Sequence, residues 1–123
     1  MPEQIQKKLG ALEKRQDRWE PKKIEISGIS GTTKIRYVSV GAMHAFAIIE
    51  NDNGVVSWGQ NTFGQCGIGQ KTDSVFRPTK LKSFGQESMV RQIACGEIHT
   101  IFLMGNGSVM TCGSNEFGQL GLY

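Results

Sequence analysis

Short apolar runs separated by glycine-containing turns predict strands through most of the chain. Residues 35–40 are rich in β-branched side chains, and residues 45–49 are apolar throughout. An Asn-Gly dipeptide then precedes a third apolar run at residues 55–58. Asn-Gly is typical of tight hairpins, because both residues tolerate a positive φ. The pattern therefore predicts three consecutive antiparallel strands.

The same succession recurs further along the chain, with predicted strands at residues 90–95, 100–104 and 108–112 and a second Asn-Gly dipeptide before the last of them. His99 follows His44 by 55 residues, and Gly113 follows Gly59 by 54. Matched segments at a nearly constant spacing indicate an internal repeat.

A proline-led segment precedes the three strands in each repeat, and Pro78 follows Pro21 by 57 residues. We expect Pro21–Ile26 and Pro78–Lys82 to be outer strands, because proline is tolerated at strand starts and sheet edges. Four short strands recurring about every 50 residues are typical of a propeller blade. The sequence therefore predicts an all-β fold with two four-stranded antiparallel blades of a β-propeller, forming an incomplete ring.

The predicted division of the chain has three parts. Residues 19–77 form the first repeat, and residues 78–123 form the second, truncated at its end. Residues 1–18 form a basic flank in which Ile5, Leu9 and Leu12 share one helical face. This flank is either a short helix or the remnant of a preceding blade.

Composition narrows the class of protein. Sixteen of 123 residues are glycine, about twice the usual share of ~7%, which suits many tight turns. The net charge of +3 is weak, so nucleic-acid binding through the basic N-terminus is a secondary hypothesis. No signal peptide and no apolar run of membrane-spanning length is present. Three cysteines without a C-x-x-C spacing indicate reduced thiols, and we expect an intracellular protein, nuclear or cytoplasmic.

Two sequence motifs carry a family resemblance. Residues 93–103 (IACGEIHTIFL) and 115–122 (NEFGQLGL) resemble the two signatures of the regulator of chromosome condensation repeat family. Both motifs have counterparts one repeat earlier, where Cys66 replaces the usual leucine. The repeat-signature residues, which we interpret as structural, are Gly41, His44, Trp58, Gly59, Asn61, Gly64, Gln65, Gly67, Gly96, His99, Gly113, Asn115, Gly118, Gln119 and Gly121.

The resemblance implies a seven-bladed propeller, so further blades would come from a longer chain or from other copies. It also implies candidate activities. Family members include exchange factors for the small GTPase Ran that associate with chromatin, and propellers found in ubiquitin ligases. No insertion here matches the wedge hairpin or the acidic loops on which exchange depends in that family.

The residues themselves indicate binding and give no indication of catalysis. His44 and His99 each stand without a metal-ligating or acid–base partner nearby in sequence, and the glycine-rich runs lack the order of a phosphate-binding loop. We therefore predict no catalytic residue, no metal and no cofactor, and a protein-interaction module that is not an enzyme. The longest loop region, residues 60–77, is the candidate partner-contact surface, through Phe63, Lys71, Asp73, Phe76 and Arg77.

Overall fold

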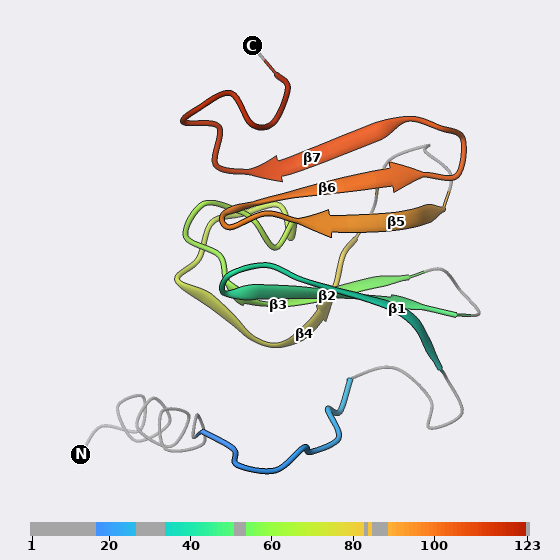
Figure 1. Cartoon of the computed structure of the whole chain (residues 1–123), viewed down its shortest axis with the longest axis vertical. Coiled ribbons are helices and arrows are strands. Elements are labelled where there is room, and N and C mark those ends of the chain that lie inside the picture. The colour runs from blue at the N-terminus through green and yellow to red at the C-terminus, as the bar shows by residue number, and fades with distance from the viewer. Residues whose placement is uncertain (1–16, 27–33, 51–53, 83, 85–88, 123) are drawn as a thin grey trace.

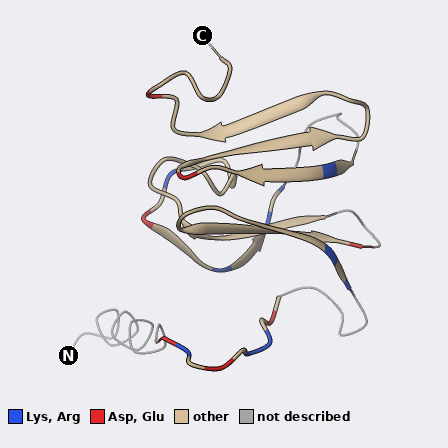
Figure 2. Ribbon diagram, in the orientation of Figure 1, with Lys and Arg blue, Asp and Glu red and all other residues tan. Residues whose placement is uncertain are grey.

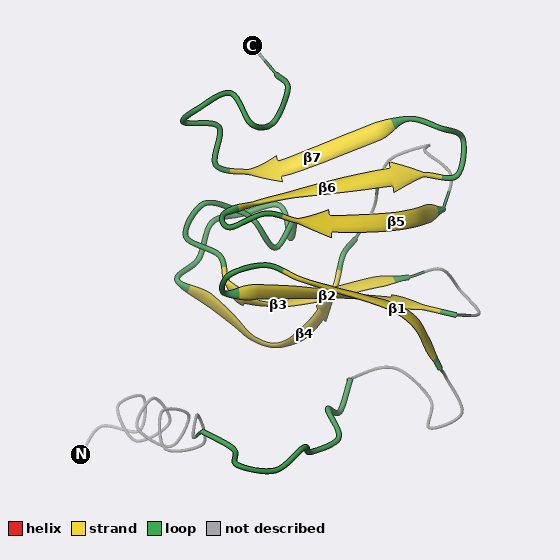
Figure 3. Cartoon of the chain, in the orientation of Figure 1, coloured by secondary structure: helices red, strands yellow, loops and turns green. Residues whose placement is uncertain are grey.

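The computed structural model describes residues 17–26, 34–50, 54–82, 84 and 89–122. Its regular elements are all strands in this part of the chain (Figure 3). The strands are β1 (Ile35–Val40), β2 (His44–Ile49), β3 (Val55–Gln60), β4 (Ser74–Lys80), β5 (Val90–Cys95), β6 (His99–Met104) and β7 (Val109–Gly113). They form two antiparallel sheets that lie face to face (Figure 1). The all-β propeller-blade prediction is confirmed.

The first sheet has the order β1-β2-β3-β4, and every neighbouring pair is antiparallel. Strand β2 is central and buried along its whole length. Because successive side chains of a strand point to opposite faces, its uninterrupted apolar run places apolar groups on both sides of the sheet. This sheet therefore needs cover on both faces.

The second sheet has the order β5-β6-β7. The turn between β6 and β7 was predicted around Asn106-Gly107, and it forms with a shifted centre. The N–H of Gly107 donates to the carbonyl of Met104 at 3.0 Å, which makes Gly105 and Asn106 the central pair. Gly107 follows at a φ of 90°. This is the three-residue hairpin loop in which the last residue takes a positive φ.

The strand predicted at Pro78–Lys82 belongs to the first sheet and not to the second. It starts at Ser74, as β4, and pairs with β3 through Val56↔Lys80 and Gly59↔Val75. The predicted boundary between residues 77 and 78 therefore falls inside a strand. The described part of the second sheet has three strands instead of four, because its predicted outer strand completes the sheet before it.

The outer strand predicted at Pro21–Ile26 does not form, and these residues have no regular structure. Pro21 is the counterpart of Pro78 in the repeat, and the strand that contains Pro78, β4, pairs with the preceding strand β3. No strand precedes β1 in the described residues, so the segment has no such partner. The alternatives for residues 1–18, helix or blade remnant, concern a flank of which only residues 17 and 18 are described.

The principal hydrophobic core lies between the two sheets. Phe46, Ile48, Val55 and Leu81 come from the first sheet and its following loop, and Val90, Ile93, Phe102 and Met104 from the second. The rings of Phe46 and Phe102 meet edge to face, with centroids 5.3 Å apart. Burying one such large apolar side chain contributes about 1.5–3 kcal/mol, so this core fixes the two sheets against each other.

A smaller core covers the outer face of the first sheet. Ala47, Ile49 and Val56 are buried there, and Ile26 and Trp58 pack against them. Ile26 belongs to the segment that runs beside the first sheet, away from the second (Figure 1). Charged residues gather in this segment and in the loops, and the strands carry few (Figure 2).

Candidate functional site

The signature motif Asn-x-Phe-Gly-Gln forms the same closed loop in both repeats. The side-chain oxygen of Asn61 accepts from the N–H of Cys66 at 3.1 Å. Asn115 accepts from the N–H of Leu120 at the same distance. The asparagine side chain thus replaces a backbone acceptor inside the loop, as the local turn chemistry of asparagine allows.

The glutamine of the motif closes the loop from the other side. Gln65 Oε1 accepts from the N–H of Phe63 at 2.9 Å, and Gln119 Oε1 accepts from that of Phe117 at 2.8 Å. The two loops differ in their surroundings. The first loop packs against the second sheet, and its Gln65 is fully buried there. The second loop is open to solvent, and its Phe117 is 83% exposed.

A hydroxyl on the third strand of each repeat anchors this loop to its own sheet. Ser57 Oγ donates to the carbonyl of Cys66 at 2.7 Å. Thr111 Oγ1 donates to the carbonyl of Leu120 at 2.8 Å. Neither hydroxyl was predicted from the sequence, although Ser57 and Thr111 are 54 residues apart and share the period of the repeat.

Gly41 and Gly96 make room for the two histidine rings. A Cβ on Gly41 would overlap the ring of His44, and a Cβ on Gly96 would overlap the ring of His99. The spacing Gly-x-x-His therefore reflects a ring that lies directly on glycine backbone. Each histidine ring thus packs on the glycine three residues before it. The described residues contain no group of three or more side chains suited to hold a metal.

A buried hydrogen-bond relay joins the two sheets through one threonine. Thr100 Oγ1 lies 2.8 Å from His44 Nε2 and donates to the carbonyl of Gln65, also at 2.8 Å. A hydroxyl has one proton, and a carbonyl can only accept, so His44 Nε2 must be the donor to Thr100. His44 is therefore the Nε2–H tautomer, and its buried Nδ1 has no partner within the described structure.

Other contacts between the sheets also pass from side chain to backbone. The hydroxyl of Tyr37 donates to the carbonyl of Ile93 at 3.0 Å, and Arg36 donates to the carbonyl of Val90 at 2.8 Å. Both donors lie on β1 and both acceptors on β5. The edge strands β1 and β5 of the two sheets are thus joined by these two hydrogen bonds, in addition to the apolar core.

We expect the stability of the chain to fall on acidification because of His44. Burial, and then the nearby His99, lowers the pKa of His44 below its usual 6.5. A lowered folded-state pKa gives stability that is present above the unfolded pKa and lost as the pH falls through the folded value. Urea unfolding from pH 7.5 downward should show this loss starting near pH 6.5. The variant His44→Gln, which can still donate to Thr100, should show a smaller slope below pH 6.5, and an unchanged slope would contradict the assignment.

The three cysteines lie near the interface between the sheets and are poor nucleophiles there. Burial raises the pKa of the Cys66 thiol to about 11 and that of Cys112 to about 12. Burial also raises the pKa of Cys95. Because the thiolate is the reactive form, these groups are protonated and inert at neutral pH.

The five predicted contact residues are all exposed, and the structure brings only two of them to one hollow. Asp73 and Phe76 line a depression of about 470 Å³ together with Met43 and Trp58. Phe76 is 60% exposed on the edge strand β4. Phe63, Lys71 and Arg77 lie outside the lining of this hollow.

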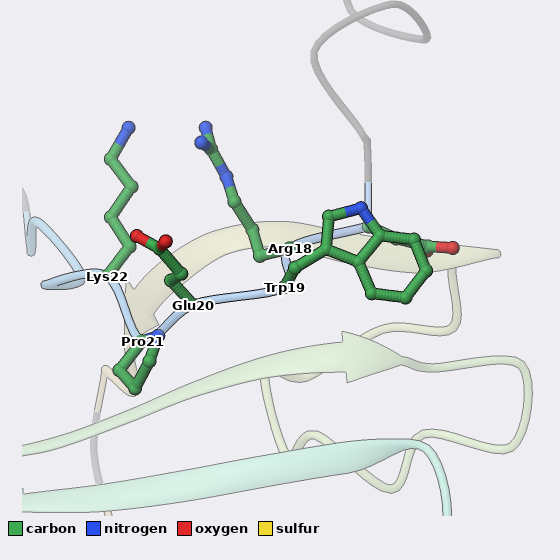
Figure 4. Close-up of a pocket in the computed structure, with 6 residues that line it drawn as sticks. Arg18, Trp19, Glu20, Pro21 and Lys22 are labelled. Carbon is green, nitrogen blue, oxygen red and sulfur yellow. The ribbon is translucent and has the colours of Figure 1, made fainter.

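A second hollow, of about 360 Å³, is formed by the consecutive residues Asp17, Arg18, Trp19, Glu20, Pro21 and Lys22 (Figure 4). Trp19 is 94% exposed. No side chain from either sheet lines this hollow, so its shape depends on the backbone of one extended segment.

Within the described residues, no helix is long and apolar enough to cross a membrane.

Comparison with known proteins agrees with this geometry. Models of the regulator of chromosome condensation (RCC1) repeat match residues 52–103 and 90–119. The guanine nucleotide exchange factor SRM1 of Saccharomyces cerevisiae is 34% identical over 75% of the chain, which covers 19% of that protein. The ultraviolet-B receptor UVR8 of Arabidopsis thaliana is 36% identical over 86% of the chain, which covers 23% of the receptor.

Solved structures show the same arrangement of sheets. Yeast RCC1 (Prp20), determined bound to Kap60, matches 72% of the chain at 34% identity with a TM-score of 0.66, and the match covers 20% of that structure. Human WBSCR16 matches 75% of the chain at 26% identity with a TM-score of 0.63. The chain thus spans between 19% and 25% of the length of these relatives. With the repeat models, the paired signature loops and the blade-like sheets in agreement, the chain belongs to the regulator of chromosome condensation (RCC1) repeat family.

Proposed function

We propose that this chain is a non-catalytic protein-interaction module, part of a propeller, which contacts its partner through the loop region 60–77 and the outer strand β4. The observation that carries the proposal is the exposed edge of the first sheet. There Phe76 lines a hollow together with Asp73 and Trp58, and the exposed Arg77 follows Phe76 on β4. An aromatic group among charges at an accessible edge is a typical protein-contact composition.

The roles of the polar residues support binding over chemistry. His44 hydrogen-bonds across the sheet interface, and the thiols of Cys66 and Cys112 are kept protonated by burial. The two signature glutamines and asparagines bond within their own loops. These groups are occupied in holding the fold, which leaves the exposed loop and edge residues to meet a partner.

The relatives suggest which partners to test. The yeast protein Prp20 was characterised for binding to Gsp1p and to histones, and it was also crystallised with Kap60. A small GTPase is therefore our first candidate partner, with chromatin through histones as the second. A guanine-nucleotide exchange activity is the alternative function, because SRM1 carries that name. A role beside a ubiquitin ligase is a further alternative, since human HERC4, a probable E3 ligase, is 37% identical over 54% of the chain.

We expect the protein to be located in the nucleus or the cytoplasm.

A binding and exchange experiment separates these proposals. Purified Gsp1p loaded with labelled GDP is titrated with the full 123-residue chain, and both complex formation and GDP release are followed. We expect binding without faster release, and weaker binding for Phe76→Ser and Arg77→Glu by about tenfold, because edge aromatics and arginines carry much of such contacts.

The matched controls are Trp19→Ser and Arg91→Glu, which remove an exposed aromatic and an exposed charge elsewhere in the molecule. Both should bind as the unchanged chain does. Accelerated GDP release would replace our proposal with the exchange function. Binding lost equally in controls and edge variants would show that β4 is not the contact surface.

A further inference from the structure

We propose that Asn106 is a site of self-modification, at which the side-chain amide is lost as ammonia and the residue becomes aspartate or isoaspartate. Asn106 is exposed in the turn between β6 and β7, directly before Gly107 (Figure 1). This turn lies outside the loop region 60–77 and strand β4. The inference therefore stands or falls independently of the proposed function.

The side chain of Asn106 is held by both donors of Ser108. Its Oδ1 accepts from the Ser108 N–H at 3.0 Å and from Ser108 Oγ at 2.7 Å. The first of these bonds closes an Asx turn, in which the side chain of an asparagine bonds to the backbone two residues on. The closed ring contains Cγ of Asn106 and the backbone nitrogen of Gly107. The turn thus keeps near each other the two atoms that must join in the reaction.

The reaction needs only water and a base from the solvent. The Gly107 nitrogen gives its proton to the base and forms a bond to Cγ of Asn106. The bond between Cγ and the side-chain nitrogen then breaks, and this nitrogen takes a proton from water and leaves as ammonia. Water opens the resulting cyclic imide at one of its two carbonyls. Opening at one carbonyl gives aspartate, and opening at the other gives isoaspartate.

The surroundings of the turn both assist this reaction and limit its rate. Attack on Cγ places negative charge on Oδ1, the atom that both Ser108 donors already contact. Donors held at a developing oxyanion stabilise it. Space is also open around Gly107, where a Cβ would meet no atom within 4 Å. The Gly107 N–H, however, donates to the carbonyl of Met104 at 3.0 Å. The tip of the hairpin must therefore open locally before the nitrogen reacts, which makes the conversion slow.

The two products have different consequences for the hairpin. Residues 99–113 contain no Lys, Arg, Asp or Glu, so the new carboxylate brings an acidic group to an otherwise uncharged pair of strands (Figure 2). Aspartate can accept the same two hydrogen bonds from Ser108, and its charge strengthens them. Isoaspartate adds a methylene group to the backbone between Met104 and Ser108, whose N–H and carbonyl are bonded at 2.9 Å. We therefore expect aspartate to preserve the turn and isoaspartate to disturb it.

Peptide mapping by mass spectrometry tests the conversion in the full chain, incubated in mildly alkaline buffer. We expect residue 106 to gain the mass difference between an amide and a carboxyl group, at a rate that rises with pH. Ser108→Ala should slow the gain roughly fivefold, which is less than a donor contributes in a dry oxyanion site, because water screens the exposed turn. Ser108→Thr keeps the hydroxyl and should convert as the unchanged chain does.

The same measurement in urea separates the effect of the fold from that of the Asn-Gly dipeptide. The unfolded chain no longer holds the Ser108 donors on Oδ1, so Ser108→Ala should have no effect there. Asn106→Gln should gain no mass at this position over the same time, because its longer side chain must close a larger ring. A native Asn106 that stays intact while the unfolded chain converts would overturn the proposal. So would equal rates for Ser108→Ala and the unchanged chain under native conditions.

Discussion

Replacing Thr100 with valine should lower the free energy of unfolding by roughly 2–4 kcal/mol, although the side chain keeps its shape. The hydroxyl of Thr100 is fully buried, accepts from His44 and donates to the carbonyl of Gln65. Valine fills the same space but leaves the imidazole N–H without an acceptor in a buried site. It also leaves the Gln65 carbonyl with only the weak, 3.7 Å contact from Cys112 Sγ. Each unsatisfied buried group costs about 1–3 kcal/mol.

The control for this experiment is Thr100→Ser, which keeps the hydroxyl and removes one methyl group. We expect it to cost about 1 kcal/mol, the value of one buried methyl-sized group. Urea unfolding followed by circular dichroism gives both values on one scale. If serine and valine were equally destabilising, the loss would come from packing alone, and the relay would not contribute to holding the two sheets together.

Replacing Gly59 with alanine should be more damaging, with an expected loss of about 3 kcal/mol or more. Gly59 has a φ of 106°, where an L-residue is strained by about 1–3 kcal/mol. In addition, a Cβ at this position would overlap the carbonyl oxygen of Met43 and lie 2.7 Å from the Cα of His44. Both are backbone atoms that the β2–β3 ladder holds in place, since His44 and Gly59 are register partners. The clash therefore cannot be relieved by moving a flexible side chain.

Gly64→Ala is the matched comparison, because it changes the same residue type in the same repeat. Gly64 has a φ of 78°, but no atom lies within 4 Å of a Cβ built there. Only the backbone term remains, about 1–2 kcal/mol. The two variants, unfolded under the same conditions, should differ by at least about 1–2 kcal/mol. A difference near zero would mean that the close approach of Met43 to Gly59 does not constrain the fold.

The strands could be predicted because their signals are local. Residues 35–40 and 90–95 were predicted with the bounds that β1 and β5 have in the structure. A β-branched run that ends at a glycine favours a strand by its local composition, before its pairing partner is known. The recurrence of the runs then indicated blades, since a unit with two apolar faces needs neighbours.

The pairings between distant residues could not be predicted in the same way. Strand β4 was predicted in the second sheet but belongs to the first, because proline and the apolar pattern indicate a strand without indicating which strand it pairs with. The partner of His44 is 56 residues away, on Thr100, and this position holds an alanine in the first repeat. The period therefore gave no reason to expect a hydroxyl there. The anchoring hydroxyls of Ser57 and Thr111 were accessible in principle, because both repeats carry one at the same place.

Strand β4 also decides where the chain can be divided. A piece that stops at residue 77, as the sequence period suggests, would lose the register pairs of Val56 with Lys80 and of Ser57 with Thr79. It would also lose Leu81, whose side chain is buried in the core between the sheets. The first sheet can be excised intact only by cutting beyond Leu81. For grafting or shuffling of such blades, the chain should therefore be joined after the outer strand, several residues later than the point at which the sequence repeat starts again.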